Sequence, residues 1–278
     1  MTQTVQSPLT QVRRGNGAPL VSTADLPPRG QFIANAFIAD AGGELLDLVN
    51  PADESVITQV LVGTADDVDR AVESALAAKS GWAQLVPKQR AEILHRIADR
   101  VAEHAELLAR LEAANTGKPL TVARDDIAQT IDTFRFMAGA ARSITSHAAG
   151  DYAEGHLSVI VREPLGAIGV VTPWNYPLLM AAWKIAPILA AGNVLVLKPS
   201  EQTPLTTLKF AELVADLLPA GVFNVVTGFG QVVGDRLSAH PQLDMIALTG
   251  SVNSGKAVAA TLLRHSSGFT SNSAAKPR

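Results

Sequence analysis

The second half of the chain repeats one pattern four times, a short apolar run followed by a stretch with helical spacing. The runs are GAIGVVT (166–172), NVLVL (193–197), FNVV (223–226) and MIALT (245–249). Their Val, Ile and Leu residues are almost continuous and do not alternate with polar ones, as in strands buried on both faces. Such strands, separated by helices, predict an α/β fold with a doubly wound, Rossmann-like parallel sheet and right-handed crossovers.

The part before residue 166 is predicted to add short strands and a helical layer. Residues 31–60 carry β-branched residues between turn signals, which is typical of short strands. From Thr64 to residue 146 the apolar residues recur at helical spacing, and single helices are expected over 87–117 and 123–146. The segment 156–164 is expected to form one arm of a hairpin.

Composition excludes several classes of function. The 278 residues carry a net charge of −3, with 23 basic and 26 acidic side chains, so neither nucleic acid nor a membrane is expected as a partner. Residues 1–30 are polar, rich in Pro and Gly and unlike a signal peptide, so we expect a disordered arm and a cytoplasmic location. Cysteine is absent, which excludes disulfides, thiolate metal sites and a thiol nucleophile. The histidines show no metal-ligand spacing, and no metal is expected.

The residues that follow the apolar runs are distinctive. They are TPWN (172–175), KPSE (198–201), TGFG (227–230) and TGSVNSG (249–255). Ligands of open parallel sheets bind beyond the carboxyl ends of the strands. We therefore expect the four segments to lie along one edge of the sheet and to line one crevice.

Two glycine patterns could hold a phosphate. Gly228, Gly230 and Gly234 lie between a strand and a helix, but their spacing differs from the dinucleotide fingerprint, and a tight turn would need the same glycines. The segment 250–257 matches the GxxxxGK part of a P-loop, yet Ala257 stands where that motif needs Ser or Thr for magnesium. A P-loop nucleoside triphosphatase stays open as an alternative.

The other two strand ends carry polar side chains with two possible roles each. Lys198 and Glu201 could hold ribose hydroxyls or form a surface ion pair. Asn175, between two prolines, could be a rigid oxyanion donor or could cap the helix that follows. Lys184, farther along that helix, is expected to extend its head group into solvent.

The motifs PWNYP, KPSE, GFGQVVG and TGSVNSG, in this order, resemble those of the NAD(P)-dependent aldehyde dehydrogenase superfamily, from about Phe32 to Ala260. The stretches FRFMAGAAR and AAGDYAEGHLSVIVREPLGAIGVVTPWNYPLLMAAWKIAPILAAGN are most similar to the γ-aminobutyraldehyde and betaine-aldehyde branch. The resemblance implies an NAD-binding domain over 31–260, with part of the oligomerisation strands near 147–165. It also implies NAD as cofactor, a small-molecule aldehyde as substrate and a homo-oligomer for the intact family.

The resemblance assigns roles to single residues. Asn175 would be the amide of the oxyanion hole, and Lys184 matches a lysine given a charge-relay role in the betaine branch. Trp174 would line the nicotinamide side, and Lys198 and Glu201 would bind the adenosine ribose. Further cofactor-binding positions are Gly230, Gly234 and Ser251 around adenine and pyrophosphate, with Thr172, Pro173, Ser200, Thr249 and Gly250 beside them.

The chain lacks two groups that the family's reaction needs. In that reaction a cysteine thiolate attacks the aldehyde, hydride passes to NAD, and a glutamate activates water. There is no cysteine here, and a motif like HLELGGKAP with the glutamate should follow the helix that begins at Ser254. A small, polar tail at 261–278 stands there instead. We expect the chain to be truncated before the catalytic domain and inactive by itself.

The tail can be interpreted as the product of translation in a shifted reading frame. Residues 269–278 can be encoded by TTC ACC TCG AAC TCG GCG GCA AAG CCC CG, after a GGA codon for Gly268. From the final A of GGA, the same bases encode Ile-His-Leu-Glu-Leu-Gly-Gly-Lys-Ala-Pro, the missing motif. The hypothesis is a slip of one base in the gene near residues 260–266.

The predicted function is NAD-dependent oxidation of an aldehyde, such as an aminoaldehyde. The alternatives are a non-catalytic nucleotide-binding remnant and a P-loop enzyme.

Overall fold

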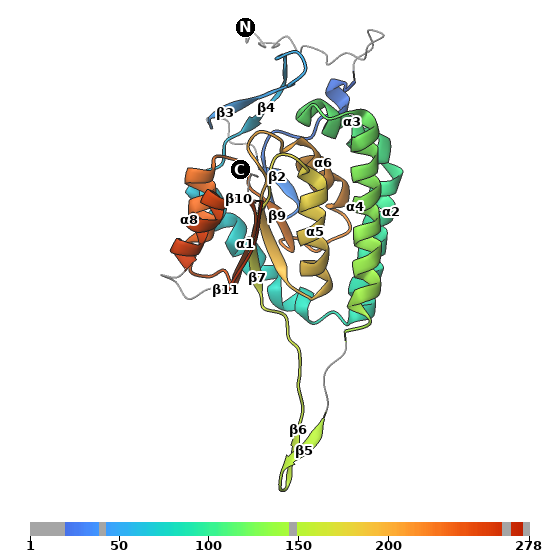
Figure 1. The fold of residues 1–278 in the computed structure, drawn as a ribbon, viewed down its shortest axis with the longest axis vertical. Helices are drawn as coiled ribbons and strands as arrows, with labels where there is room; N and C mark the ends of the chain where they lie inside the picture. The colour runs from blue at the N-terminus through green and yellow to red at the C-terminus, as the bar shows by residue number, and fades with distance from the viewer. Residues whose placement is uncertain (1–19, 39–42, 145–148, 263–267, 275–278) are drawn as a thin grey trace.

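A seven-stranded sheet forms the centre of the molecule, in the order β11-β10-β7-β8-β9-β1-β2 (Figure 1). The computed structural model describes residues 20–38, 43–144, 149–262 and, for the backbone alone, 268–274. The four predicted strands run parallel to one another, as expected. They are β7 (Ala167–Val171), β8 (Val194–Lys198), β9 (Phe223–Val225) and β10 (Met245–Ser251).

The direction in which successive strands of the chain are placed across the sheet reverses after β9. Strands β7, β8 and β9 follow one another across the sheet, whereas β10 returns to the other side of β7. The carboxyl ends of β7 and β10 therefore lie at a topological switch point, where open α/β sheets bind their ligands.

The N-terminal part forms short strands, as the sequence predicts; two of them join the sheet, and two form a separate hairpin. Strand β1 (Gln31–Ile33) pairs antiparallel with β9 and with β2 (Ala36–Ile38), while β3 (Leu45–Val49) and β4 (Val56–Leu61) pair with each other. The buried Gln31 amide joins these parts, because it donates to the Leu61 carbonyl (3.0 Å) and accepts from the Thr227 N–H (2.7 Å).

Helices cover both faces of the sheet, which confirms the doubly wound class (Figure 1). One face carries α5 (Pro177–Ala190) and α6 (Leu205–Val214), and the other carries α1 (Ala65–Ala83), α7 (Asp235–Ser238) and α8 (Val252–Leu262). The predicted helical layer packs outside α5 and α6 and consists of α2 (Pro87–Glu103), α3 (Ala105–Thr116) and α4 (Leu120–Ala141).

Two predicted helices have different bounds. The helix expected over 87–117 is two helices, since the backbone leaves the helical region at His104, with φ −108° and ψ 16°. The His104 ring nitrogen Nδ1 lies 3.0 Å from the Arg100 carbonyl, which also accepts the His104 N–H. The side chain thus joins the backbone in completing the last turn of α2. The helix expected over 123–146 begins earlier, at Leu120, and ends at Ala141.

Both ends of the described chain are more regular than predicted. Residues 20–30 were expected in a disordered arm, but Thr23–Asp25 form a 3-10 helix and Val21 is buried; residues 1–19 lie outside the described residues. In the tail, the backbone of β11 (Gly268–Ala274) pairs in parallel with β10. An edge strand needs only backbone pairing on one side, so a run without an apolar period can form it. The out-of-frame hypothesis concerns the gene and stays a prediction.

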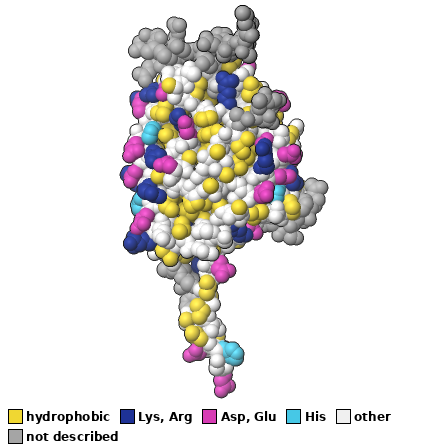
Figure 2. All heavy atoms as spheres, turned by 180° about the vertical axis from the view of Figure 1, so that it is seen from behind, with side chains coloured by type: hydrophobic (Ala, Val, Ile, Leu, Met, Phe, Trp, Pro, Cys, Tyr) yellow, Lys and Arg dark blue, Asp and Glu magenta, His cyan; other side chains and the backbone are white. Residues whose placement is uncertain are grey.

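A hairpin of β5 (Gly150–Ala153) and β6 (His156–Ser158) projects away from the body of the molecule (Figure 1). This arm carries hydrophobic side chains along its length (Figure 2), among them Tyr152, Leu157 and Val161, which are 76%, 68% and 73% exposed. The expected hairpin is present, although its second strand is shorter than 156–164. No helix within the described ranges is long and apolar enough to cross a bilayer.

Candidate functional site

A cavity of about 680 Å³ lies at the carboxyl ends of β7, β8 and β10. Every predicted site residue except Lys184 lines it, so the structure brings the four strand-end segments together as expected. The predicted lining residues are Thr172, Pro173, Trp174, Asn175, Lys198, Ser200, Glu201, Gly230, Gly234, Thr249, Gly250 and Ser251.

Sequence reasoning missed the helical wall of this cavity. Gln231 comes from the π-helix Gly230–Gly234, and Asp235 and Ser238 come from α7, which follows it directly. Ser254, Ala257 and Val258 come from α8. The spacing of Gly230, Gly234 and Ser238, each four residues from the next, would have indicated that Ser238 shares a helical face with the two glycines.

Two of the three glycines in the segment 228–234 are not required by the fold. Gly228 has φ +139°, and a Cβ there would lie 2.7 Å from the Val233 side chain, so this glycine serves the turn. At Gly230 an added Cβ would meet nothing within 4 Å, and at Gly234 it would make an ordinary contact of 3.7 Å with Lys198. Gly234 has a helical φ of −66°. Glycines without a conformational or packing need, on a cavity wall, fit close approach of a ligand to the backbone.

Lys198 and Glu201 form a partly buried ion pair at the cavity. The Lys198 side chain is only 4% exposed; its Nζ lies 3.1 Å from Glu201 Oε2 and donates to the Pro199 carbonyl. Burial lowers the pKa of Lys198, and the nearby Glu201 carboxylate opposes that shift. The alternative of a surface ion pair is therefore wrong for Lys198. The Glu201 side chain is 35% exposed and can accept hydrogen bonds from a ligand's hydroxyl groups.

The turn that carries Asn175 is held from two sides. The Thr203 hydroxyl donates to the Trp174 carbonyl (3.1 Å), and the Lys118 ammonium lies 4.7 Å from the centre of the Tyr176 ring. Asn175 itself is exposed at the cavity. Its alternative role as a helix cap is wrong, because the N-cap of α5 is Tyr176 and no side chain caps that end.

Lys118 is fixed in turn by two buried carboxylates. Its Nζ lies 3.1 Å from Glu112 and 2.7 Å from Asp126, and the second Glu112 oxygen accepts a bond from Thr206 (2.6 Å). Burial raises the pKa of Glu112, and the charge of Lys118 opposes that shift. The network joins α4 and α6 to the end of α3, and Lys118 links it to the turn at the cavity.

The P-loop alternative does not fit the structure. Strand β10 ends at Ser251 and α8 begins at Val252, so there is no loop to enclose a phosphate. Gly255 and Lys256 lie in the first turns of the helix. Ser251 caps this helix, because its hydroxyl accepts the Ser254 N–H at 3.1 Å.

Lys184 lies on α5 and does not line the cavity. It is half-buried, and burial lowers its pKa, so the expectation of a fully solvated head group is wrong. Among the described residues, no hydrogen bond or ion pair joins Lys184 to another predicted site residue.

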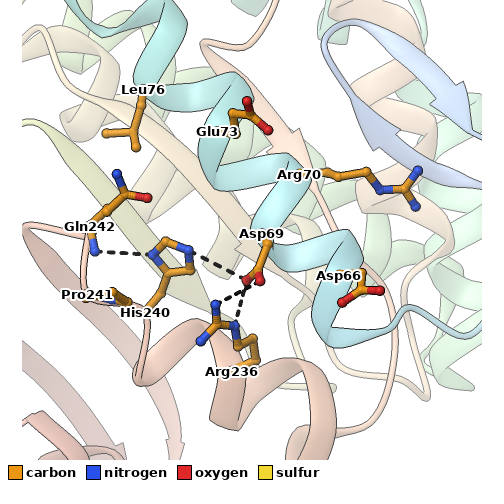
Figure 3. A pocket seen from close by; sticks show the side chains of 9 residues that line it. All are labelled: Asp66, Asp69, Arg70, Glu73, Leu76, Arg236, His240, Pro241 and Gln242. Atoms are coloured by element: carbon orange, nitrogen blue, oxygen red, sulfur yellow. Dashed lines mark hydrogen bonds and ion pairs between the residues drawn. The ribbon is translucent and has the colours of Figure 1, made fainter.

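A second, polar cavity of about 530 Å³ lies between α1 and the segment 236–242 (Figure 3). Arg236 makes two hydrogen bonds to the Asp69 carboxylate, at 2.6 and 2.8 Å, and His240 Nε2 lies 3.6 Å from the same carboxylate. Burial lowers the pKa of His240, the neighbouring Arg236 lowers it further, and Asp69 opposes both. These contacts hold α7, which lines the strand-end cavity, against α1.

Comparison with known proteins gives a consistent result. Residues 37–272 match the family described as "Aldehyde dehydrogenase family". An aldehyde dehydrogenase of Davidiella tassiana is 42% identical over 233 residues, 83% of this chain and 47% of its own length. Acetaldehyde dehydrogenase 2 of Cupriavidus necator is 41% identical over 231 residues, 82% of this chain and 45% of its own length. The chain thus spans about half the length of these relatives.

A solved structure shows the same fold. Betaine aldehyde dehydrogenase of Staphylococcus aureus, crystallised in complex with NAD+, is 36% identical and superposes with a TM-score of 0.86. The match covers 89% of this chain and 50% of that one. With the parallel sheet, the strand-end cavity and the matched sequence in agreement, the chain belongs to the aldehyde dehydrogenase family.

Proposed function

We propose that the chain binds NAD in the strand-end cavity and provides the cofactor-binding part of an NAD-dependent aldehyde oxidation. The observation that carries this proposal is the set of residues that form the cavity wall. Gly230 and Gly234 leave backbone open to a ligand where the fold does not require glycine, beside the partly buried pair of Lys198 and Glu201. The NAD+ complex of the structural relative supports the choice of ligand.

The chain's own residues bind and orient in this proposal. Lys198 and Glu201 hold the hydroxyls of a ribose, since an ammonium donates and a carboxylate accepts. Asn175 offers an amide N–H to an oxyanion, held in place by the turn that Thr203 and Lys118 fix. NAD supplies the hydride acceptor when bound. Lys184 keeps its predicted charge-relay role only as a proposal, because it lies outside the cavity.

We propose an aminoaldehyde as the substrate class of the whole enzyme. The similarity of FRFMAGAAR and of the stretch 148–193 to the betaine-aldehyde branch supports this, as does the betaine aldehyde dehydrogenase among the structural relatives. Other relatives are named for acetaldehyde and for long-chain aldehydes. A substrate panel must therefore include all three classes.

The binding part of the proposal is tested by calorimetric titration of the purified chain with NAD and ADP. We expect both to bind, and saturable binding that is weakened in a Lys198→Met variant would support the site. Wild-type protein that is folded but binds neither nucleotide would contradict the proposal.

The catalytic part is tested by NADH absorbance with each aldehyde and excess NAD. We expect no turnover by the chain alone, because it has no cysteine to attack the aldehyde. Turnover that follows the purified chain and disappears in Asn175→Ala would show that no thiol is needed, and the proposed inactivity would be wrong.

We further propose that the tail is out-of-frame text. The support is that residues 269–278 can be encoded by bases that spell the glutamate motif in an adjacent frame. DNA sequencing across codons 260–278 tests this. A gene without that motif in either adjacent frame would contradict it.

A further inference from the structure

Two buried hydroxyl groups in residues that line the strand-end cavity have no hydrogen-bond partner. Among the described residues, the buried side-chain polar atoms without a partner are Trp82 Nε1, Thr172 Oγ1, Thr207 Oγ1 and Ser238 Oγ. Thr172 and Ser238 line the cavity, whereas Trp82 and Thr207 do not. A buried polar atom without a partner costs stability, so such atoms need an explanation, and a ligand is one. Thr172 is already a predicted cofactor contact, but Ser238 is not.

The surroundings of Ser238 suit an uncharged ring better than a phosphate. Ser238 lies on α7 and is 4% exposed. The part of the cavity wall formed by the π-helix Gly230–Gly234, by α7 and by α8 contains no Lys, Arg or His among its lining residues. It includes the Asp235 carboxylate, which would repel a phosphate. The buried side chains of Leu248 and Val258 add apolar surface to the same cavity. The cationic group at the cavity is Lys198, at the end of β8.

We propose that the Ser238 hydroxyl hydrogen-bonds the base of the bound adenine nucleotide and contributes to the choice of base. This inference rests on the proposed NAD site and adds a specificity-determining residue to it. A hydroxyl both donates and accepts, and the edge of adenine offers ring-nitrogen acceptors and an amino donor. In the structure the Ser238 Oγ atom is buried and out of reach of water. To contact the base, the hydroxyl therefore rotates about the Cα–Cβ bond to another staggered position.

Thr207 offers a matched control. Its hydroxyl is also buried without a partner, but it lies on α6, away from the cavity. Ser238→Ala and Thr207→Val each remove a hydroxyl that has no partner in the protein. Neither variant should therefore lower the Tm of the ligand-free chain, and a rise of about 1–3 °C is expected for each.

Binding should separate the two variants. Calorimetric titration of the whole chain with AMP and with IMP gives affinities for two bases that differ in the amino group and at N1. We expect Ser238→Ala to weaken AMP binding about fivefold to tenfold and to reduce the preference for AMP over IMP. Thr207→Val should leave both values unchanged, within about twofold.

The outcomes are distinguishable. Wild-type affinity and base preference in Ser238→Ala would overturn the role of Ser238 and leave the NAD site intact. Absence of AMP and NAD binding in the wild type would overturn both proposals. A lowered Tm in Ser238→Ala would show a structural partner for the hydroxyl and count against the inference. Ser238→Cys then keeps the side-chain size, and unchanged AMP binding in that variant would overturn the inference as well.

Discussion

Lys198 and Lys209 are two buried lysines that each pair with a glutamate three residues farther along the chain. Their side chains are 4% and 9% exposed, and the distances to the carboxylates are 3.1 and 2.8 Å. Only Lys198 lines the strand-end cavity. The comparison separates what a buried lysine does for stability from what it does for a ligand.

Replacement of Lys198 by Met should weaken NAD binding and stabilise the ligand-free chain. Burial lowers the pKa of Lys198, which means that the folded protein disfavours its charged form, and an apolar side chain removes that cost. Loss of a charged hydrogen-bond donor should cost about 1.5–3 kcal/mol of binding free energy. Calorimetry and thermal unfolding measure the two effects. Lys209→Met is the control, and an equal loss of NAD affinity there would contradict the assignment.

Alanine at the three glycines of the segment 228–234 should give opposite results. Gly234→Ala should stabilise the chain by up to about 1 kcal/mol, because alanine is the better helix former, and Gly230→Ala should be neutral, but both should bind NAD about tenfold more weakly. Gly228→Ala should destabilise by about 1–3 kcal/mol, since φ +139° is strained for alanine. Denaturant unfolding and NAD titration test this. Normal NAD binding by Gly230→Ala and Gly234→Ala would count against a ligand close to their backbone.

Single residues were predicted best where a motif fixes their place at a strand end. Lys198, Glu201 and Asn175 line the cavity because each follows a parallel strand, and parallel strands end at one edge of the sheet. The apolar pattern of these strands predicts that arrangement. Ser238 was missed, because it comes from a four-residue helix whose orientation depends on packing against α1. Lys184 was misjudged because periodicity shows the side of a helix and not how deeply a neighbouring helix covers it.

At the scale of elements, α7 stands between two cavities. One side of its segment carries Gly234 and Ser238 toward the strand-end cavity, while Arg236 and His240 reach Asp69 on α1 (Figure 3). The ion pair therefore fixes the element that forms the helical wall of the proposed nucleotide site.

This contact should make stability sensitive to mild acid. The pKa of His240 is lowered from the ordinary 6.5, so the unfolded chain binds a proton at a higher pH than the folded one. Stability should therefore be full above about pH 6.5 and should fall as the pH drops from there through the lowered pKa. The charged ring would also lose the hydrogen bond that Nδ1 accepts from the Gln242 N–H (3.2 Å).

The measurement is urea unfolding near neutral pH and in mild acid. Between these conditions the wild type should lose more stability than His240→Asn, because only the wild type has this ring to protonate. His95→Asn, at an exposed position on α2, is the control. A wild-type pH profile that matches that of His240→Asn would contradict the prediction.

The types of the elements were predictable, and some of their bounds were not. Thr64 marks the start of α1 with a reciprocal pair of hydrogen bonds to Asp67, which are local interactions that sequence reveals. The break at His104 depends on the contact between its ring nitrogen and the Arg100 carbonyl, one helical turn earlier. The spacing of the hydrophobic residues does not reveal this contact. Strand β11 was missed because its extended conformation is determined by pairing with β10 and not by its own composition.

At the scale of the whole molecule, the projecting arm leaves a large apolar surface uncovered in the single chain. Leu157, Val159 and Val161 are between 60% and 73% exposed. Surfaces of this kind associate with one another or with other chains. The homo-oligomer implied by the family resemblance fits this exposure and stays a proposal.

Polar replacements on the arm should reduce self-association without loss of stability. The triple variant Leu157→Ser, Val159→Thr, Val161→Thr changes side chains with few packing contacts, so its Tm and NAD affinity should equal those of the wild type. Size-exclusion chromatography with light scattering should show a smaller species or less aggregate. Val86→Thr, which changes an exposed apolar side chain elsewhere, should have no such effect. A triple variant that associates like the wild type would contradict the prediction.

The overall topology followed from the apolar runs and the handedness rule, since these two constraints leave few arrangements of four parallel strands. The side of the sheet on which β1 and β2 would lie did not follow. Their place next to β9 rests on long-range contacts, such as the tilted packing of the Phe32 ring against the Phe223 ring, with ring centres 6.0 Å apart.

The bond between Thr227 and Gln31 joins residues that are 196 positions apart in the chain. During synthesis on the ribosome, at about 5–20 residues per second, the first strand emerges roughly 10–40 seconds before its partner exists. For that time the main-chain donors and acceptors on the edge that pairs with β9 are open to any nascent or finished strand nearby. Chaperones that bind short apolar segments have their longest opportunity here, so the yield of soluble protein should depend on the speed of translation between these two positions.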